Sequence, residues 1–136
     1  MSGTAIMRAL LAANAKVTAL VPAANIRAGL IPQGTVLPGI SVHSISENEE
    51  GTIARNMPNR MIRERVQVTV YTKDNYALMK NIMKATALGP GVFTGQIVGF
   101  KLRSVLPWGV GPEIPPTDDK IYEQSRDFMV TFVEAN

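Results

Sequence analysis

Few residues of this sequence could carry acid–base or nucleophilic chemistry. The chain has one histidine, His43, and no cysteine. A nucleophile, a general base and a group that orients the base cannot be assembled from these residues at any recognisable spacing. We therefore expect His43 to be an ordinary strand residue and the protein not to be an enzyme. The lack of cysteine also excludes disulfides and thiolate metal sites.

Two patterns resemble cofactor sites only superficially. Asp118, Asp119 and Glu123 form an acidic group, and their oxygens would suit Mg²⁺ or Ca²⁺. The glycine and ligand spacing of a calcium loop is missing, so a solvated turn is the favoured interpretation. The stretches "GPGVFTG" and "GQIVGFK" lack the lysine–serine/threonine ending of a phosphate loop. No metal or other cofactor is predicted.

Basic residues on and between the predicted strands raise the question of nucleic-acid binding. They are Arg55, Arg60, Arg63, Arg65, Lys73, Lys101 and Arg103. Strand alternation places Arg63 with Arg65, and Lys101 with Arg103, on common sides of their strands. Aromatic content is only 6%, and no aromatic residue is interleaved with these cations. Sequence-specific reading is therefore not expected, although a nearby phosphate backbone could be accommodated.

Charge divides the chain into two parts of opposite sign. Residues 1–112 carry twelve Lys/Arg against five Asp/Glu, a net charge of +7, whereas residues 113–136 carry two against six, a net charge of −4. Identical copies placed head to tail could set a basic surface against an acidic one, which steers assembly and fixes orientation. The alternative is that these charges are simply solvated.

Length and hydrophobic periodicity predict one domain that spans residues 1–136. A hydrophobic content of 46% gives a chain of this size an adequate core. No apolar run approaches the about 20 residues needed to cross a bilayer, so a soluble protein is expected. The predicted fold is α+β: a mostly antiparallel sheet of four to five strands, with two helices packed on one face, in the order αβββαββ.

The first predicted helix begins near Ser2 or Thr4 and stops at Pro22, with a bend near Asn14. Its apolar positions are Ile6, Leu10, Ala13, Val17 and Leu20. The opposite face is rich in alanine, with Arg8 and Lys16 as its only charges. Either another subunit or element covers this face, or it is an ordinary alanine-rich surface.

The other elements follow from alternation and turn residues. A short edge strand is expected over residues 24–31, and "ISVHSIS" and "RVQVTVYT" are strands. Asp74 or Thr72 is expected to cap a second helix that buries Leu78, Met79, Ile82, Met83 and Ala85. Two last strands are expected, over residues 96–106 and 121–133, with Phe128, Val130 and Phe132 on one face.

Two segments are predicted to project from the sheet: residues 47–61 and the Pro/Gly-rich residues 107–120. The first is too long and polar for a simple turn. Its acids, Glu47, Glu49 and Glu50, could meet a basic partner, and its arginines, Arg55 and Arg60, an acidic one. The alternative is a surface loop without a partner.

Four segments together resemble a family of tailed-bacteriophage proteins. They are "ALLAANAKVTALV", "IRAGLIPQGTVLPGISVHSIS", "RERVQVTVYTKDNYALMKNIMKAT" and "IYEQSRDFMVTF". In order and spacing they are similar to the tail completion or tail terminator proteins of siphophages, whose relatives include the lambda tail terminator. The resemblance runs from about residue 5 to residue 133, and the two projecting segments are richer than in a minimal member.

The resemblance implies a structural protein of the virion, made in the host bacterial cytoplasm and located at the tail or neck. It implies a hexameric ring that sits on the last ring of tail-tube subunits, stops polymerisation and faces the neck of the DNA-filled head. DNA would only pass through the channel. Residues expected at protein interfaces are Glu47, Glu49, Glu50, Arg55, Arg60, Arg63, Arg65, Asp118, Asp119 and Glu123.

Two questions stay open at the level of sequence. The basic residues Arg63, Arg65, Lys101 and Arg103 could line the channel or a subunit interface, with Lys101 and Arg103 the favoured channel residues. The protein could also be another neck component, such as a head-closure or adaptor protein, or, less favoured, a free basic DNA-binding domain.

Overall fold

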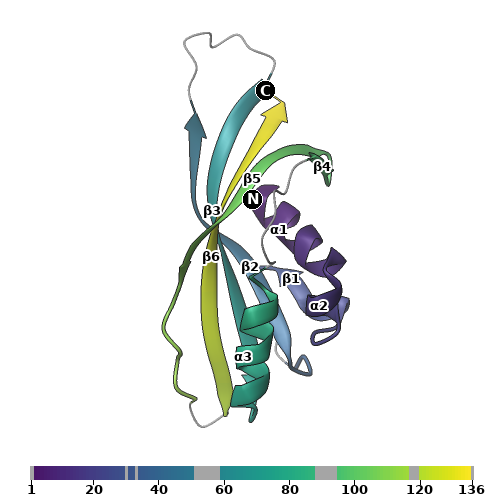
Figure 1. Cartoon of the computed structure of the whole chain (residues 1–136), viewed down its shortest axis with the longest axis vertical. Coiled ribbons are helices and arrows are strands. Elements are labelled where there is room, and N and C mark those ends of the chain that lie inside the picture. Colours follow the sequence, from purple (N-terminus) through teal and green to yellow (C-terminus); the bar gives the residue numbers. More distant parts are fainter. Residues whose placement is uncertain are drawn as a thin grey trace.

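A long, twisted sheet with helices along one face makes up the body of the protein (Figure 1). The computed structural model describes residues 2–29, 31–32, 34–50, 59–87, 95–116 and 120–135. In chain order, its elements are α1 (Ser2–Ala13), α2 (Ala15–Thr18), the 3-10 helix η1 (Ala23–Asn25), β1 (Ile26–Ala28), β2 (Gly39–Glu50), β3 (Asn59–Lys73), α3 (Tyr76–Ala85), β4 (Gly95–Ile97), β5 (Phe100–Val110) and β6 (Ile121–Ala135).

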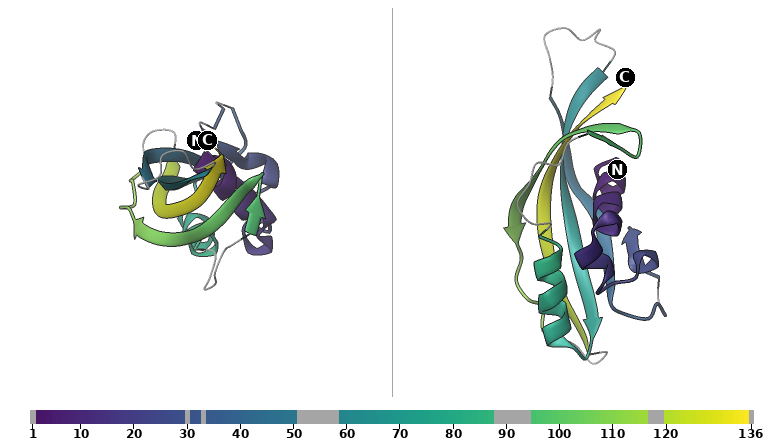
Figure 2. Two further views of the ribbon diagram at one scale, coloured as in Figure 1. Left: turned by 90° about the horizontal axis from the view of Figure 1, so that it is seen from above. Right: turned by 45° about the vertical axis from the view of Figure 1, so that its right-hand side comes forward.

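The described residues form a six-stranded sheet in the order β1-β2-β3-β6-β5-β4. Only β1 and β2 pair in parallel; the other neighbours are antiparallel. The central pair runs from Asn59↔Ala135 to Lys73↔Ile121 without a register shift. Because strands twist about their own axes, this long pair twists strongly, and β5 curls around β6 (Figure 2). The predicted α+β class is confirmed, with more strands than expected.

The core lies between the sheet and the helices. Val66, Val68 and Val70 alternate along β3 and are fully buried, as the sequence predicts. Across the β3–β6 ladder, Phe128 lies opposite Val66 on the same face. Helices α1 and α3 both lie along this face of the sheet, with α3 further towards the lower end of the long axis in Figure 1. Burial of such side chains contributes about 1.5–3 kcal/mol each, so this face anchors both helices.

The first helix is interrupted at Asn14, where the sequence predicts a bend. The Asn14 side chain accepts hydrogen bonds from the backbone N–H groups of Lys16, at 2.9 Å, and Val17, at 3.3 Å, and so caps α2. The predicted apolar register is partly wrong: Met7 is fully buried and Ala13 is exposed. Both differences lie before Asn14, and Val17 beyond the break is buried as predicted. Met7 and Leu11, four positions apart, form the buried stripe of α1 together with Ile6.

The second predicted helix is α3, and its apolar face is confirmed. Met79, Ile82 and Met83 are buried. The predicted cap is wrong, because neither Asp74 nor Thr72 but Asn75 caps the helix and accepts a 2.9 Å hydrogen bond from the Leu78 N–H.

Three predicted boundaries differ from the structure. Residues 47–50 and 59–61 belong to β2 and β3 rather than to a loop, because the polar ends of these strands continue the ladder. The single strand expected over residues 96–106 is a β4–β5 hairpin that turns at Val98 and Gly99, both with positive φ. Residues 107–110, expected in a loop, continue β5. Residues 51–58 and 117–119 lie outside the described residues.

Candidate functional site

Two of the predicted interface arginines, Arg60 and Arg65, make ion pairs within the chain. Arg60 contacts Glu49 at 3.1 Å and Glu134 at 3.2 Å, and its hydrogen bond to Glu49 is the main cause of its raised pKa. Arg65 contacts Asp127 at 2.6 Å. Basic residues of the first part of the chain thus meet acids of the last part inside one molecule. Opposite charges in the two parts of the sequence therefore join neighbouring strands within one molecule, in addition to any contact that they make between copies.

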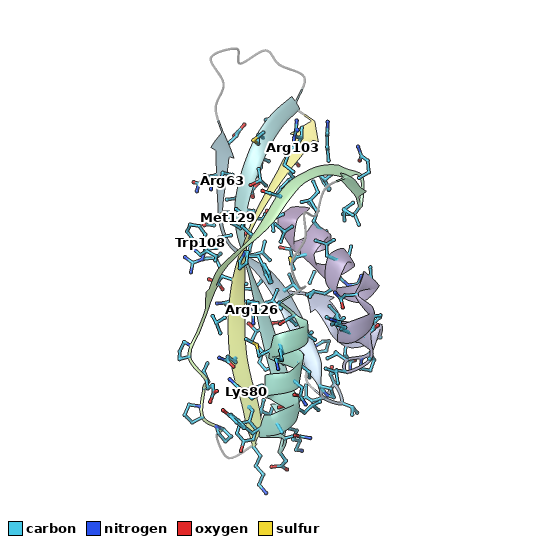
Figure 3. The ribbon with its side chains drawn as sticks, in the orientation of Figure 1. Arg63, Lys80, Arg103, Trp108, Arg126 and Met129 are labelled. Atoms are coloured by element: carbon cyan, nitrogen blue, oxygen red, sulfur yellow. The ribbon has the colours of Figure 1, made fainter. Side chains whose placement is uncertain are left out.

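Other predicted cations remain on the surface. Arg63, Lys101 and Arg103 are exposed. Arg63 lies opposite Thr131, and Lys101 opposite Val133, so these two lie near one another across β6. Alternation from the buried residues of β3 places Arg63 on the face away from the helices (Figure 3).

The structure shows few contacts at the other residues that were predicted as sites. His43 is a strand residue in β2, as expected, with its Nε2 3.0 Å from Oε1 of Gln67. Glu123 lies on β6, where its carbonyl accepts a backbone hydrogen bond from Ile114. Arg55, Asp118, Asp119 and the side chain of Glu50 are outside the described residues. Within the described part of the chain, no cluster of three His, Asp or Glu residues could hold a metal ion.

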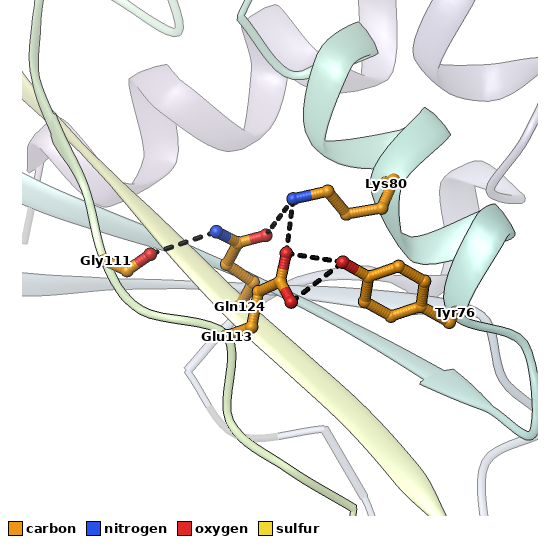
Figure 4. A network of polar contacts seen from close by, with 5 residues as sticks. All are labelled: Tyr76, Lys80, Gly111, Glu113 and Gln124. Carbon is orange, nitrogen blue, oxygen red and sulfur yellow. Dashed lines mark hydrogen bonds and ion pairs between the residues drawn. The ribbon is translucent and has the colours of Figure 1, made fainter.

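A polar network that sequence reasoning missed joins α3 to the segment after β5 (Figure 4). The Glu113 carboxylate accepts hydrogen bonds from the Lys80 ammonium at 2.6 Å and from the Tyr76 hydroxyl at 2.7 Å. These donors lower the pKa of Glu113, and the same contacts raise the pKa of Lys80 and of Tyr76. Gln124 completes the network by donating to the carbonyl of Gly111 at 3.0 Å. The network fixes residues 111–113 against α3.

Beside this network lies a groove of about 370 Å³ between α3 and the end of β5. Its lining residues are Lys80, Asn81, Met83, Lys84, Val110, Gln124 and Arg126. Arg126 donates through Nη2 to the Met83 carbonyl at 3.0 Å, while its Nε is buried with no partner among the described residues. Burial lowers the pKa of Arg126. Figure 3 shows Lys80 and Arg126 on this side of the sheet. The groove is therefore lined by cations.

Three large apolar residues of β5 are exposed. They are Leu106, Trp108 and Val110, which are 53%, 53% and 55% exposed. The sequence does place large apolar residues at alternate positions here, as in a strand, but the prolines and glycines around them favoured a loop. Val110 lines the groove and lies opposite Arg126, whereas Leu106 lies opposite Met129. Because the register shifts between Pro107 and Gly109, Leu106 and Val110 point to opposite faces of the sheet.

Comparison with known families identifies the group to which the chain is related. Residues 5–99 match the family described as Tail completion protein gp17. The chain belongs to this family of phage tail completion proteins. Family membership places it in the tail of the virion, as a structural component.

Solved structures show that this tail completion protein has a fold found elsewhere in virus-like particles. A chain from the virion of a native gene transfer agent particle superposes with a TM-score of 0.69 at 14% sequence identity, covering 96% of this chain and 94% of that chain. A second solved chain, of no stated function, gives a TM-score of 0.56 at 17% identity, covering 96% and 95%. A search of curated proteins gave no match. Among the described residues of this tail completion protein, no helix is long and apolar enough to cross a membrane.

Proposed function

We propose that this protein forms a hexameric ring that caps the phage tail tube, ends tube polymerisation and joins the tail to the head or neck. The observation that carries the proposal is the family match over residues 5–99. The full-length likeness to a chain of a gene transfer agent virion supports the fold on which it rests.

The surface of the chain suits a ring. A closed ring is built from heterologous contacts, in which one patch meets a different patch on the next copy. The groove beside α3 carries Lys84 and Arg126, while the end of the β2–β3 hairpin carries acids and arginines together, among them the Glu49–Arg60 pair. These two surfaces are unlike, as a heterologous contact requires.

Deletion of the gene from its phage tests the capping role. We expect tails of excessive and variable length without attached heads, measured in negatively stained micrographs, with normal particles restored by the wild-type gene in trans. Tails of normal length with heads attached would overturn the proposal. Tails of normal length without heads would overturn termination of the tube and favour a head-closure or adaptor role.

Two positions in such a ring are open to the exposed cations Arg63, Lys101 and Arg103. They either line the channel through which DNA passes or lie between subunits. Cryo-electron microscopy of the tail end separates the two, because channel residues would face the symmetry axis. In the channel, these cations would accommodate phosphates without reading sequence.

A further inference from the structure

We infer that the β4–β5 hairpin is one side of the contact between subunits, with Val98 at its tip as the apolar contact residue. The other side lies on the neighbouring copy, at the end of its sheet where Ile114 and Tyr71 flank Glu123. Val98 packs against the two flanking side chains, and Lys101 pairs with the carboxylate. This inference rests on the proposed ring and names the two surfaces that join its subunits.

Val98 occupies a backbone conformation that its side chain disfavours. Ile97 pairs with Phe100, so Val98 and Gly99 form a two-residue turn. Their φ angles are 44° and 85°. A turn with positive φ at both central positions favours asparagine, aspartate or glycine at the first of them, and a β-branched residue there is an outlier. Gly99 fits its position, whereas Val98 is strained.

Contacts within the chain do not account for a valine at this tip. Val98 is 54% exposed, whereas its neighbour Ile97 packs against the core. The other residues with positive φ in the described part of the chain, apart from glycines, are Asp74 and Lys120, which are polar. Strained backbone residues concentrate at sites of function. The unfavourable and exposed valine therefore indicates an apolar contact with another molecule.

The hairpin carries positive charge beside this apolar tip. Lys101 and Arg103 are the charged residues of the segment 88–112, which contains no acid. Lys101 is exposed, lies three residues after Val98, and makes no ion pair among the described residues. A surface that fits the hairpin therefore combines an exposed apolar side chain with an unpaired carboxylate.

The far end of the same sheet offers this combination. Ile114 lies opposite Glu123, and Glu123 lies opposite Tyr71, so the three form one row across the strands. Alternation with the buried residues of β3 places this row on the face away from the helices. Ile114 is 45% exposed, and the Glu123 side chain makes no ion pair within the described part of the chain. Residues 113–123 carry four acids and one lysine, so the charge of this segment is opposite to that of the hairpin.

One chain cannot join these two surfaces by itself. Lys101 lies opposite Val133, which is ten residues after Glu123 on β6. Ten residues of an extended strand span about 33 Å. Figure 1 shows β4 and the start of β6 towards opposite ends of the long axis. The contact is therefore available only between copies, and it is heterologous, as a ring requires.

Relief of the turn strain separates a contact between copies from a role within the monomer. Val98→Asn suits the turn, so the melting temperature of the purified protein should rise by about 4 °C. Its incorporation into tails should nevertheless fall about tenfold or more, because asparagine cannot make the apolar contact. Val98→Ile keeps a branched apolar side chain and should incorporate normally. Val36→Asn, at another exposed apolar residue, is the matched control and should also incorporate normally.

Cross-linking in assembled particles tests which surface receives the hairpin, since the chain has no cysteine of its own. The double variant Val98→Cys/Ile114→Cys, incorporated into phage tails and treated with a short bismaleimide, is expected to give a ladder from dimer to hexamer. Each single variant is expected to stay monomeric on a denaturing gel. The pair Val98→Cys/Val36→Cys is the matched control and should give no ladder.

Charge exchange gives an independent test. Lys101→Glu and Glu123→Lys should each lower incorporation about tenfold, and the two together should restore it. Lys16→Glu, at an exposed lysine on α2, should have no effect. Normal incorporation of Val98→Asn, or a ring in micrographs without the cross-linked ladder, would overturn the hairpin contact and leave the ring intact. Absence of any ring from wild-type tails would instead refute the proposed function.

Discussion

The carboxylate of Glu64, in the middle of β3, accepts a hydrogen bond from the backbone N–H of Gly3 at 3.1 Å. Its second oxygen lies 3.5 Å from the Thr4 hydroxyl. Glu64 is fully buried. The first N–H groups of a helix have no partner within the helix and carry partial positive charge, so a carboxylate from the sheet satisfies them. A strand residue thus caps α1 and fixes the start of the helix on the sheet.

Glu64→Ala should lower the free energy of unfolding by about 2 kcal/mol, because it removes this cap and leaves backbone donors buried without a partner. Urea denaturation monitored by circular dichroism measures the change. The matched control is Glu123→Ala on β6, whose side chain makes no hydrogen bond among the described residues, and which should change stability by less than about 0.5 kcal/mol. Equal effects of the two variants would contradict a capping role for Glu64.

Gly3→Ala should also destabilise the protein, although alanine is usually the better helix former. A Cβ at Gly3 would lie 2.7 Å from the Glu64 carboxyl group, and that buried side chain has little room to move. We expect a loss of about 1–3 kcal/mol. In the Glu64→Ala background the obstacle is gone, so Gly3→Ala should become neutral or stabilising. A loss of similar size in both backgrounds would show that Glu64 is not the cause.

The Arg65–Asp127 pair should stabilise the isolated monomer. Two hydrogen bonds, at 2.6 and 2.8 Å, join the guanidinium to one carboxylate oxygen across the β3–β6 ladder. A double-mutant cycle with Arg65→Met and Asp127→Asn should give a coupling energy of about 1 kcal/mol in urea denaturation. If the cycle gave no coupling energy in the monomer but the variants impaired tail assembly, Arg65 would instead act at an interface between subunits.

Sequence periodicity predicted the elements that bury one clear face. Val66, Val68 and Val70 alternate without interruption, so β3 and its buried face could be read directly. In α1 the same reasoning was partly wrong, because apolar residues occupy both position 10 and position 11, and periodicity alone did not show that Leu11 is the buried one. The ends of β2 and β3 were assigned to a loop because polar residues there form a ladder that buries no apolar core.

The candidate site was harder to predict because it depends on contacts distant in sequence. Glu113 and Lys80 are 33 positions apart, and no local pattern links them. Arg60 and Arg65 looked like free interface cations until the ladder placed Glu134 and Asp127 beside them. In contrast, the order of the segments was enough to indicate the tail completion family, which the match over residues 5–99 confirms.

Acid should weaken the attachment of residues 111–113 to α3. The hydrogen bond from Lys80, followed by that from Tyr76, holds the pKa of Glu113 below its ordinary value of 4.5. A carboxyl group whose pKa is lowered by folding stabilises the protein fully above its unfolded pKa, and this contribution disappears as the pH falls through the folded pKa. The melting temperature of Glu113→Gln should therefore be below that of the wild type at about pH 7, and the difference should shrink as the pH falls through the folded pKa of Glu113. A difference that is constant with pH would contradict this assignment.

Trp108 should report assembly through its fluorescence. It is the only tryptophan of the chain and is 53% exposed on β5. In the isolated protein, its emission should resemble that of a hydrated indole, and it should shift to shorter wavelength when the protein joins tails, because the indole then loses water. Trp108→Ala should leave the monomer as stable as the wild type, within about 0.5 kcal/mol, yet reduce incorporation about tenfold or more. Val36→Ala, at a residue 83% exposed and far from Trp108 in sequence, serves as the control and should incorporate normally. Unchanged emission on incorporation would mean that Trp108 stays in water and lies outside the contacts made in the tail.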